Sequence, residues 1–260
     1  MNRSILTRQQ KEVLEALLVQ HGLVVTSQQV AQQVAHLSDQ SRRRFIANLR
    51  GAGWLVRIKK GLYQIADLSS LGTLTLSRLT IAQLLVPESY VSFQTALQQH
   101  GLYDQGLSSV GSVALHRRAP VELEGTRYTY VTTQARYFFG FAEKSLDGRG
   151  VRIATAEKAL LDLLQFQRTQ ATVDLVLELL RENAHNLDLA RLTDYTRKLP
   201  TAVQQVTGFL LEAAGHKPLH EFHDAAQGTS VAWLTPQSSI YNSRWRIYTD
   251  PYFTATHIHT

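Results

Sequence analysis

The chain has 260 residues, no cysteine and a formal net charge of +6 at pH 7. This length is sufficient for two domains, each with its own hydrophobic core, while the absence of cysteine excludes disulfides, thiolate metal ligands and cysteine nucleophiles. The first residues lack the apolar core of a signal peptide, and no apolar run is long enough to cross a bilayer. We therefore expect a cytoplasmic protein with no membrane association.

The positive charge is concentrated near the N-terminus. Residues 1–70 carry ten lysines and arginines against four acids, whereas residues 71–260 carry seventeen of each kind. This distribution is expected of a polyanion-binding module joined to a neutral one.

Two capping boxes predict the first two helices. Residues 7–10 open a helix that extends to about residue 20, and residues 26–29 open the next. Between them, Val24 and Val25 can form one short strand.

A third helix is predicted after Ser38, which serves as its N-cap. Phe45, Ile46 and Leu49 recur at the spacing that places them on one buried face. An amide, two guanidiniums and a methyl group lie opposite, and this set reads base edges and thymine methyls in a major groove. These side chains belong to Gln40, Arg43, Arg44 and Ala47.

Residues 54–65 predict a β-hairpin that turns at residues 59–61, where Gly61 is free to adopt a positive φ. An isolated basic run would be interpreted as a solvated surface. A charged helix followed by a hairpin with two lysines is instead typical of a winged helix-turn-helix. The predicted DNA-binding residues are Gln40, Ser41, Arg42, Arg43, Arg44, Arg50, Lys59 and Lys60. Arg42 and Arg50 leave the helix toward its buried side and flank, which suits phosphates better than bases.

A Ser- and Gly-rich linker at residues 67–73 separates the expected domains, a winged helix-turn-helix at 1–68 and a larger mixed α+β domain at 73–260. Residues 216–260 show too little periodicity to place. The elements predicted after the linker are helices at 74–85 and 89–99, strands between 110 and 153, a helix at 156–166 and further helices at 172–214 with a break near Pro200.

Five segments carry a resemblance to a known family. They are RGAGWLVRIKKGLYQI, YVSFQTALQQHGL, SVALHRR, RYFFGF and, above all, VRIATAEKALLDLL. In order and spacing they resemble the AbiEi-like abortive-infection antitoxins, the transcriptional regulators of type IV toxin-antitoxin operons. The resemblance implies a non-enzymatic repressor without a cofactor, bound as two copies to an inverted repeat in its own promoter. It also implies that the C-terminal domain counters a co-encoded nucleotidyltransferase toxin.

A nucleotidyltransferase-type enzyme is one alternative. Gly111 and Ser112, followed by Glu122 and Glu124, have the outline of a motif that holds a triphosphate and Mg²⁺. A strand, rather than the start of a helix, is predicted after the serine, so a glycine turn and an alternating strand explain these residues better.

Other polar groups have simple structural interpretations. Glu157, Lys158 and Asp162 are expected on the outer face of an amphipathic helix, without catalysis. Five C-terminal histidines are interpreted as surface residues rather than metal ligands. A ligand-responsive regulator, with a small molecule bound in the C-terminal domain, stays open as a further alternative. The histidines are His216, His220, His223, His257 and His259.

Overall fold

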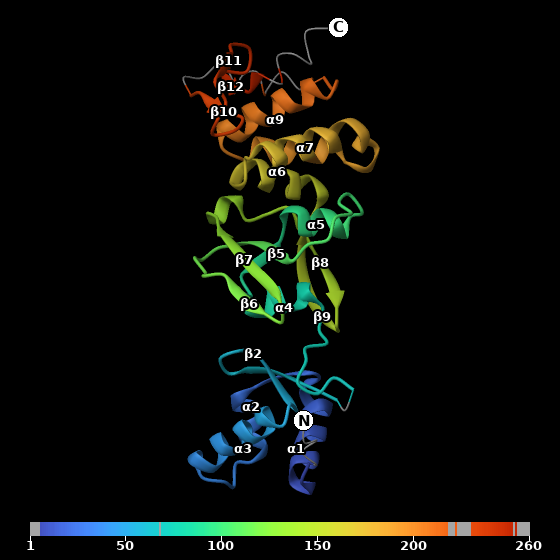
Figure 1. The fold of residues 1–260 in the computed structure, drawn as a ribbon, viewed down its shortest axis with the longest axis vertical. Helices are drawn as coiled ribbons and strands as arrows, with labels where there is room; N and C mark the ends of the chain where they lie inside the picture. Colours follow the sequence, from blue (N-terminus) through green and yellow to red (C-terminus); the bar gives the residue numbers. More distant parts are fainter. Residues whose placement is uncertain (1–5, 68, 218–221, 223–229, 252, 254–260) are drawn as a thin grey trace. The chain divides into compact units, whose positions relative to one another are not determined.

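A computed structural model describes residues 6–67, 69–217, 222, 230–251 and 253 (Figure 1). The chain divides into two compact units, residues 1–87 with 122–126 and residues 88–121 with 127–260. The order of elements confirms the predicted α+β class, in which a winged helix-turn-helix precedes a larger mixed part.

The first unit contains the helices and the small sheet expected of a winged helix. Thr7 with Gln10 and Thr26 with Gln29 form both predicted capping boxes, each reciprocal between side chain and backbone. The three strands follow the antiparallel order β1-β3-β2. The elements are α1 (Arg8–His21), β1 (Val24–Thr26), α2 (Ser27–Gln33), α3 (Asp39–Gly51), β2 (Leu55–Lys59) and β3 (Leu62–Ile65).

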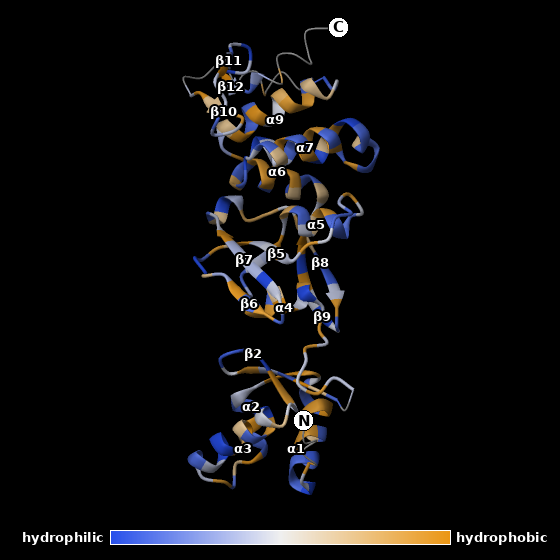
Figure 2. Ribbon diagram, viewed as in Figure 1, coloured by the Kyte–Doolittle hydropathy of each residue, from blue (hydrophilic) through white to orange (hydrophobic). Residues whose placement is uncertain are grey.

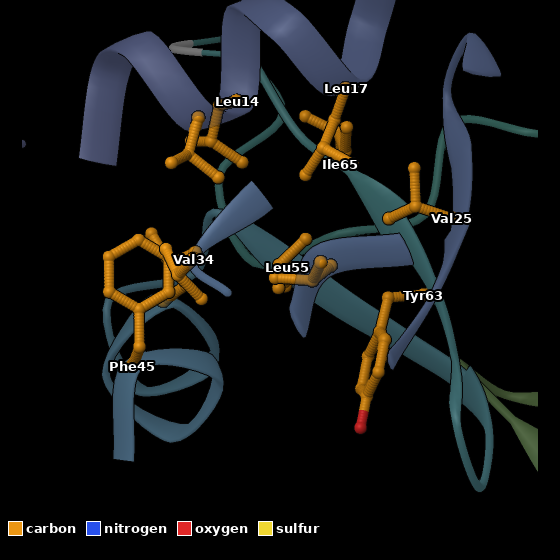
Figure 3. Close-up of a cluster of buried hydrophobic side chains, with 11 residues drawn as sticks. Leu14, Leu17, Val25, Val34, Phe45, Leu55, Tyr63 and Ile65 are labelled. Carbon is orange, nitrogen blue, oxygen red and sulfur yellow. The ribbon is translucent and has the colours of Figure 1, made fainter. Parts of the chain in front are cut away.

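The core of this unit fixes α3 against the other elements (Figure 3). Phe45 and Leu49 of α3 are buried, and the ring of Phe45 lies beside Val34. Because burial of each such side chain contributes about 1.5–3 kcal/mol, these contacts determine which face of α3 remains outside. The other residues of this core that Figure 3 labels are Leu14, Leu17, Val25, Leu55, Tyr63 and Ile65.

This compact unit extends beyond the expected boundary at residue 68, because it includes α4 (Arg78–Leu85). The buried Gln64 amide oxygen accepts hydrogen bonds from the backbone N–H groups of Thr75, at 3.0 Å, and Leu76, at 3.3 Å. These bonds hold residues 75–76 outside the helix, which is capped by Ser77. For this reason α4 begins four residues after the predicted position.

A six-stranded sheet of order β6-β7-β5-β4-β9-β8 forms the larger α+β part. The predicted helix at 89–99 is partly wrong, because Ser89–Val91 is the buried strand β4, paired with both β5 and β9. Only Phe93–Gln99 is helical, as α5. The segment RYFFGF at 136–141, which falls within the predicted strands, is mostly not a strand, because residues 135–137 form a 3-10 helix and β8 begins only at Phe141. The other strands are β5 (Ser109–Ala114), β6 (Val121–Leu123), β7 (Thr126–Thr132), β8 (Phe141–Leu146) and β9 (Arg149–Ala154).

The helix α6 (Ala156–Phe166), capped by Thr155 as predicted, is buried on all sides over its first nine residues. The expected outer face is therefore wrong: Glu157, Lys158 and Asp162 are at most 2% exposed. Tertiary packing buries these side chains, because α6 contacts α5, β9 and three later helices. Figure 2 shows α6 with more hydrophobic residues than α3. The later helices are α7 (Gln170–Glu182), α8 (Leu189–Arg197) and α9 (Thr201–Ala213).

After α9, the described residues form a small sheet that packs on this helix. Its strands are β10 (Ala232–Trp233), β11 (Ile240–Asn242) and β12 (Ile247–Thr249), in the order β10-β12-β11. Among the described residues, no helix is long and apolar enough to span a bilayer.

Candidate nucleic-acid interface

The outward face of α3 presents a continuous polar stripe. Ser38 caps the helix through its side chain, which accepts a hydrogen bond from the Ser41 N–H. Because Phe45 and Leu49 hold the inner face in the core, the opposite positions at intervals of three and four residues stay in solvent. The exposed residues are Gln40, Ser41, Arg43, Arg44 and Ala47.

The two central arginines are available for a ligand. Neither Arg43 nor Arg44 forms a hydrogen bond or ion pair with any residue in the described part of the chain. By contrast, Arg8 of α1 lies 2.9 Å from the carboxylate of Glu12, one turn away. The uncompensated positive charge is therefore on α3 rather than on α1, which favours α3 as the element that meets a polyanion.

Arg42 has a different environment from its two neighbours. Its guanidinium donates hydrogen bonds to the carbonyl oxygen of Ala35 and, at 3.2 Å, to the carboxylate of Asp39. These bonds join the first turn of α3 to the segment after α2. In this geometry Arg42 positions the helix, and because its Nε is buried, it presents fewer donors to a phosphate than Arg43 or Arg44.

A shallow hollow of about 410 Å³ lies at the C-terminal end of the stripe, between α3 and β2. Arg50 and Arg57 both line it, and both are exposed. The guanidinium of Arg50 also lies 6.0 Å from the centre of the Tyr63 ring. The hollow thus adds Arg57, which the sequence prediction omitted, to the basic surface. Strand alternation could not have identified it, because Arg57 lies two residues after the buried Leu55, and a register irregularity between Arg57 and Lys59 breaks the pattern.

The two lysines of the hairpin differ in role. The Lys59 ammonium donates hydrogen bonds to the carbonyl oxygens of Leu84, at 2.6 Å, and Leu85, at 3.2 Å. Lys60 is exposed at the turn, where Gly61 adopts a φ of +77° as expected. The geometry therefore leaves Lys60, rather than Lys59, as the lysine that is open to a ligand.

The residues of the nucleotidyltransferase outline are not arranged as that motif requires. Gly111 and Ser112 lie inside β5, not before a helix, and a Cβ at Gly111 would come within 2.8 Å of the Phe93 ring. The Glu124 carboxylate accepts a hydrogen bond from the Leu74 N–H at 2.9 Å. Packing explains Gly111 and a hydrogen bond explains Glu124, and Ser112 does not precede a helix, so this geometry does not reproduce the triphosphate-binding motif.

The VRIATAEKALLDLL segment encloses a buried polar network. The Lys158 ammonium donates to one oxygen of Asp162, while the hydroxyls of Tyr90, at 3.0 Å, and Ser92, at 2.6 Å, donate to the other. Burial raises the pKa of the Tyr90 phenol, so its hydroxyl retains the proton that it donates. The network joins β4 to α6 and has no exposed member, which is typical of a structural rather than a catalytic group.

The structure describes only one of the five histidines that were predicted to lie at the surface. The ring of His216 lies within hydrogen-bonding distance, 2.7 Å, of the Leu180 carbonyl oxygen. The other four histidines, His220, His223, His257 and His259, lie outside the described residues. Within the described part of the chain, no group of three or more histidine or acidic side chains could hold a metal ion.

An exposed basic helix followed by a short hairpin defines the winged helix-turn-helix class. Comparison with known proteins agrees, since a family model described as "Transcriptional regulator, AbiEi antitoxin" matches residues 12–66, from α1 to the end of the hairpin. The resemblance to AbiEi antitoxins is therefore confirmed over the winged helix.

A solved structure is similar over nearly the whole chain. The crystal structure of the RV2827C protein from Mycobacterium tuberculosis aligns with a TM-score of 0.63 and 15% sequence identity, covering 95% of this chain and 93% of that chain. At this identity the similarity concerns the fold alone. A comparison with curated proteins finds no match.

Proposed function

We propose that the chain is a sequence-specific DNA-binding repressor that also acts as the antitoxin of a type IV toxin-antitoxin system in the cytoplasm. The observation that carries the DNA-binding part is the stripe of Gln40, Arg43, Arg44 and Ala47 on α3. It combines exposure, uncompensated charge and side chains suited to base edges. The family match over residues 12–66 supports the same assignment.

In the proposed complex, α3 lies in the major groove. Arg43 and Arg44 are placed to donate paired hydrogen bonds to guanine, and Gln40 to read adenine. Arg50, Arg57 and Lys60 contact phosphates, which fixes the register of the helix without reading sequence. Arg42 holds the first turn of α3 in place through Ala35 and Asp39.

Two copies on an inverted repeat would occupy the promoter together, since the symmetry of a repeated operator matches two identical reading heads. Repression of its own operon is then a direct result of promoter occupancy. The antitoxin part of the proposal rests on the resemblance of the segments after the winged helix, and its target is a nucleotidyltransferase toxin encoded in the same operon.

A promoter fusion tests the repressor part. The DNA upstream of the gene is placed before a reporter, and the chain is supplied from a second plasmid. We expect wild-type protein to lower reporter output and an Arg43→Ala/Arg44→Ala variant to restore it at equal protein level. Unchanged output with wild-type protein would contradict autoregulation.

A toxicity assay tests the antitoxin part separately. The adjacent nucleotidyltransferase-type gene is induced with and without the chain, from promoters that the chain does not control. Restored growth supports the antitoxin role. Growth arrest that persists despite abundant chain would contradict it.

A further inference from the structure

Three aromatic side chains form a row across the small sheet β10-β12-β11. Tyr248 of the central strand is in register with Trp233 on one side and Tyr241 on the other. Trp233 is 48% exposed and Tyr241 is 45% exposed. We call Trp233, Tyr248 and Tyr241 the aromatic row.

The opposite face of the same sheet is committed to the core. Ala232, Ile247 and Thr249, which alternate with the aromatic row, are buried. A Cβ at Gly208 of α9 would clash with the Trp245 ring, so this indole is packed directly on the helix backbone. The sheet is therefore anchored from behind, and its exposed rings are not needed to fill the core.

The rings of the row support one another. The Trp233 and Tyr248 ring centres are 5.3 Å apart with planes inclined by 18°, and those of Tyr241 and Tyr248 are 5.4 Å apart at 55°. The first pair is stacked, an arrangement that stabilises exposed rings. Because β10 is an edge strand of this sheet, no further strand among the described residues pairs on the outer side of Trp233.

A cation lies beside this edge. The Arg168 guanidinium donates a hydrogen bond of 2.7 Å to the carbonyl oxygen of Trp233. Arg168 is half-buried, and no other partner holds its guanidinium in the described part of the chain. Across the sheet, Arg244 is 61% exposed and is paired with Glu212.

We propose that the aromatic row binds single-stranded nucleic acid, with an unpaired base stacked on Trp233 and a phosphate held by Arg168. A flat exposed indole beside a guanidinium matches a nucleotide, which offers a π-face and an anion together. A proline-rich peptide would pack against the aromatic rings, but it carries no anion that could pair with the Arg168 guanidinium. A DNA duplex keeps its bases stacked internally, so it does not compete for this site.

The binding test uses the full chain and a short fluorescent single-stranded RNA, measured by anisotropy at low salt. We expect Trp233→Ala to weaken binding about tenfold or more, and Trp233→Phe to restore most of it. Arg168→Gln should weaken binding and lower the salt slope of RNA binding by about 0.7 unit. Tyr137→Ala, which removes a partly exposed aromatic from the turn at residues 135–137, is the matched control and should bind as wild type does.

The double variant Arg43→Ala/Arg44→Ala separates this site from the proposed repressor function. It should lose binding to operator duplex and retain the binding of single strands. Equal affinity of wild type and a folded Trp233→Ala variant would overturn the proposal. So would displacement of the RNA from this double variant by duplex DNA at equal concentration, or binding of a proline-rich peptide with no binding of the RNA.

Discussion

The ammonium of Lys59 lies 2.6 Å from the carbonyl oxygen of Leu84, at the C-terminal end of α4. The last carbonyl groups of a helix have no partner within it and carry the negative end of its dipole. Lys59 satisfies two of them, at Leu84 and Leu85, so this side chain stabilises the first compact unit. Lys60, the next residue, remains exposed at the turn.

Substitution of the two lysines should separate stability from DNA binding. We expect Lys59→Met to lower the free energy of unfolding by about 1 kcal/mol, because it removes a charged hydrogen bond to a helix terminus. Urea unfolding measures this change. Lys60→Ala should leave stability unchanged and should reduce the salt slope of DNA binding by about one unit. The reverse pattern would show that the roles of the two lysines have been exchanged.

Arg43→Ala and Arg44→Ala should each weaken binding to the operator by about 1–3 kcal/mol, provided that the arginine is bidentate to guanine. Binding to a scrambled duplex should change less. Anisotropy titrations on both duplexes measure the difference. Arg8→Ala is the matched control, because Arg8 is exposed but paired with Glu12 on α1. Equal losses on both duplexes would identify the arginines as phosphate contacts.

Arg57→Ala tests the hollow beside α3. Since Arg57 is proposed to contact phosphate, its loss should weaken binding on all sequences to the same extent and lower the salt slope by about one unit. A titration of operator and scrambled DNA at several salt concentrations gives both values. An unchanged slope would place Arg57 outside the interface.

Asp162→Ala should lower the free energy of unfolding by about 3–5 kcal/mol, because it leaves the Lys158 ammonium buried without its anion. The double variant Lys158→Met/Asp162→Leu removes both charges and should recover much of that loss. Chemical denaturation of the three proteins measures the comparison. A double variant as unstable as the single one would show that packing, rather than the unpaired charge, dominates.

Asp67 should make a pH-dependent contribution to stability. Hydrogen bonds from the hydroxyls of Ser69 and Ser70 and from their backbone N–H groups lower its pKa from 3.8 to about 2. A lowered folded-state pKa stabilises the protein above pH 3.8, and this effect is lost as the pH falls toward 2. The stability difference between wild type and Asp67→Ala should therefore narrow over this range in urea unfolding. A constant difference would contradict the assignment.

The local features of the fold were predictable from the sequence. Thr7, Thr26 and Ser38 cap helices through bonds that span only three residues, so a short segment contains the whole interaction. Gly61 likewise adopts the positive φ that its turn requires. The exposed face of α3 followed from the spacing of Phe45, Ile46 and Leu49.

The predictions that were wrong concern features that depend on partners distant in sequence. Ser89–Val91 forms a strand because it pairs with β5 on one side and β9 on the other. Helical periodicity gave Lys158 and Asp162 an outer face, but later helices cover that face. Lys59 and Lys60 are equivalent in sequence, and the carbonyl groups that distinguish them lie 25 residues or more away from Lys59.

Binding of the purified chain to the DNA upstream of its own gene, compared with a scrambled duplex of equal length over a salt series, tests the central claim most directly. We expect a preference of about a thousandfold or more at moderate salt. Equally weak binding to both duplexes would contradict sequence-specific regulation, and would show that the basic surface of α3 only attaches the chain to nucleic acid.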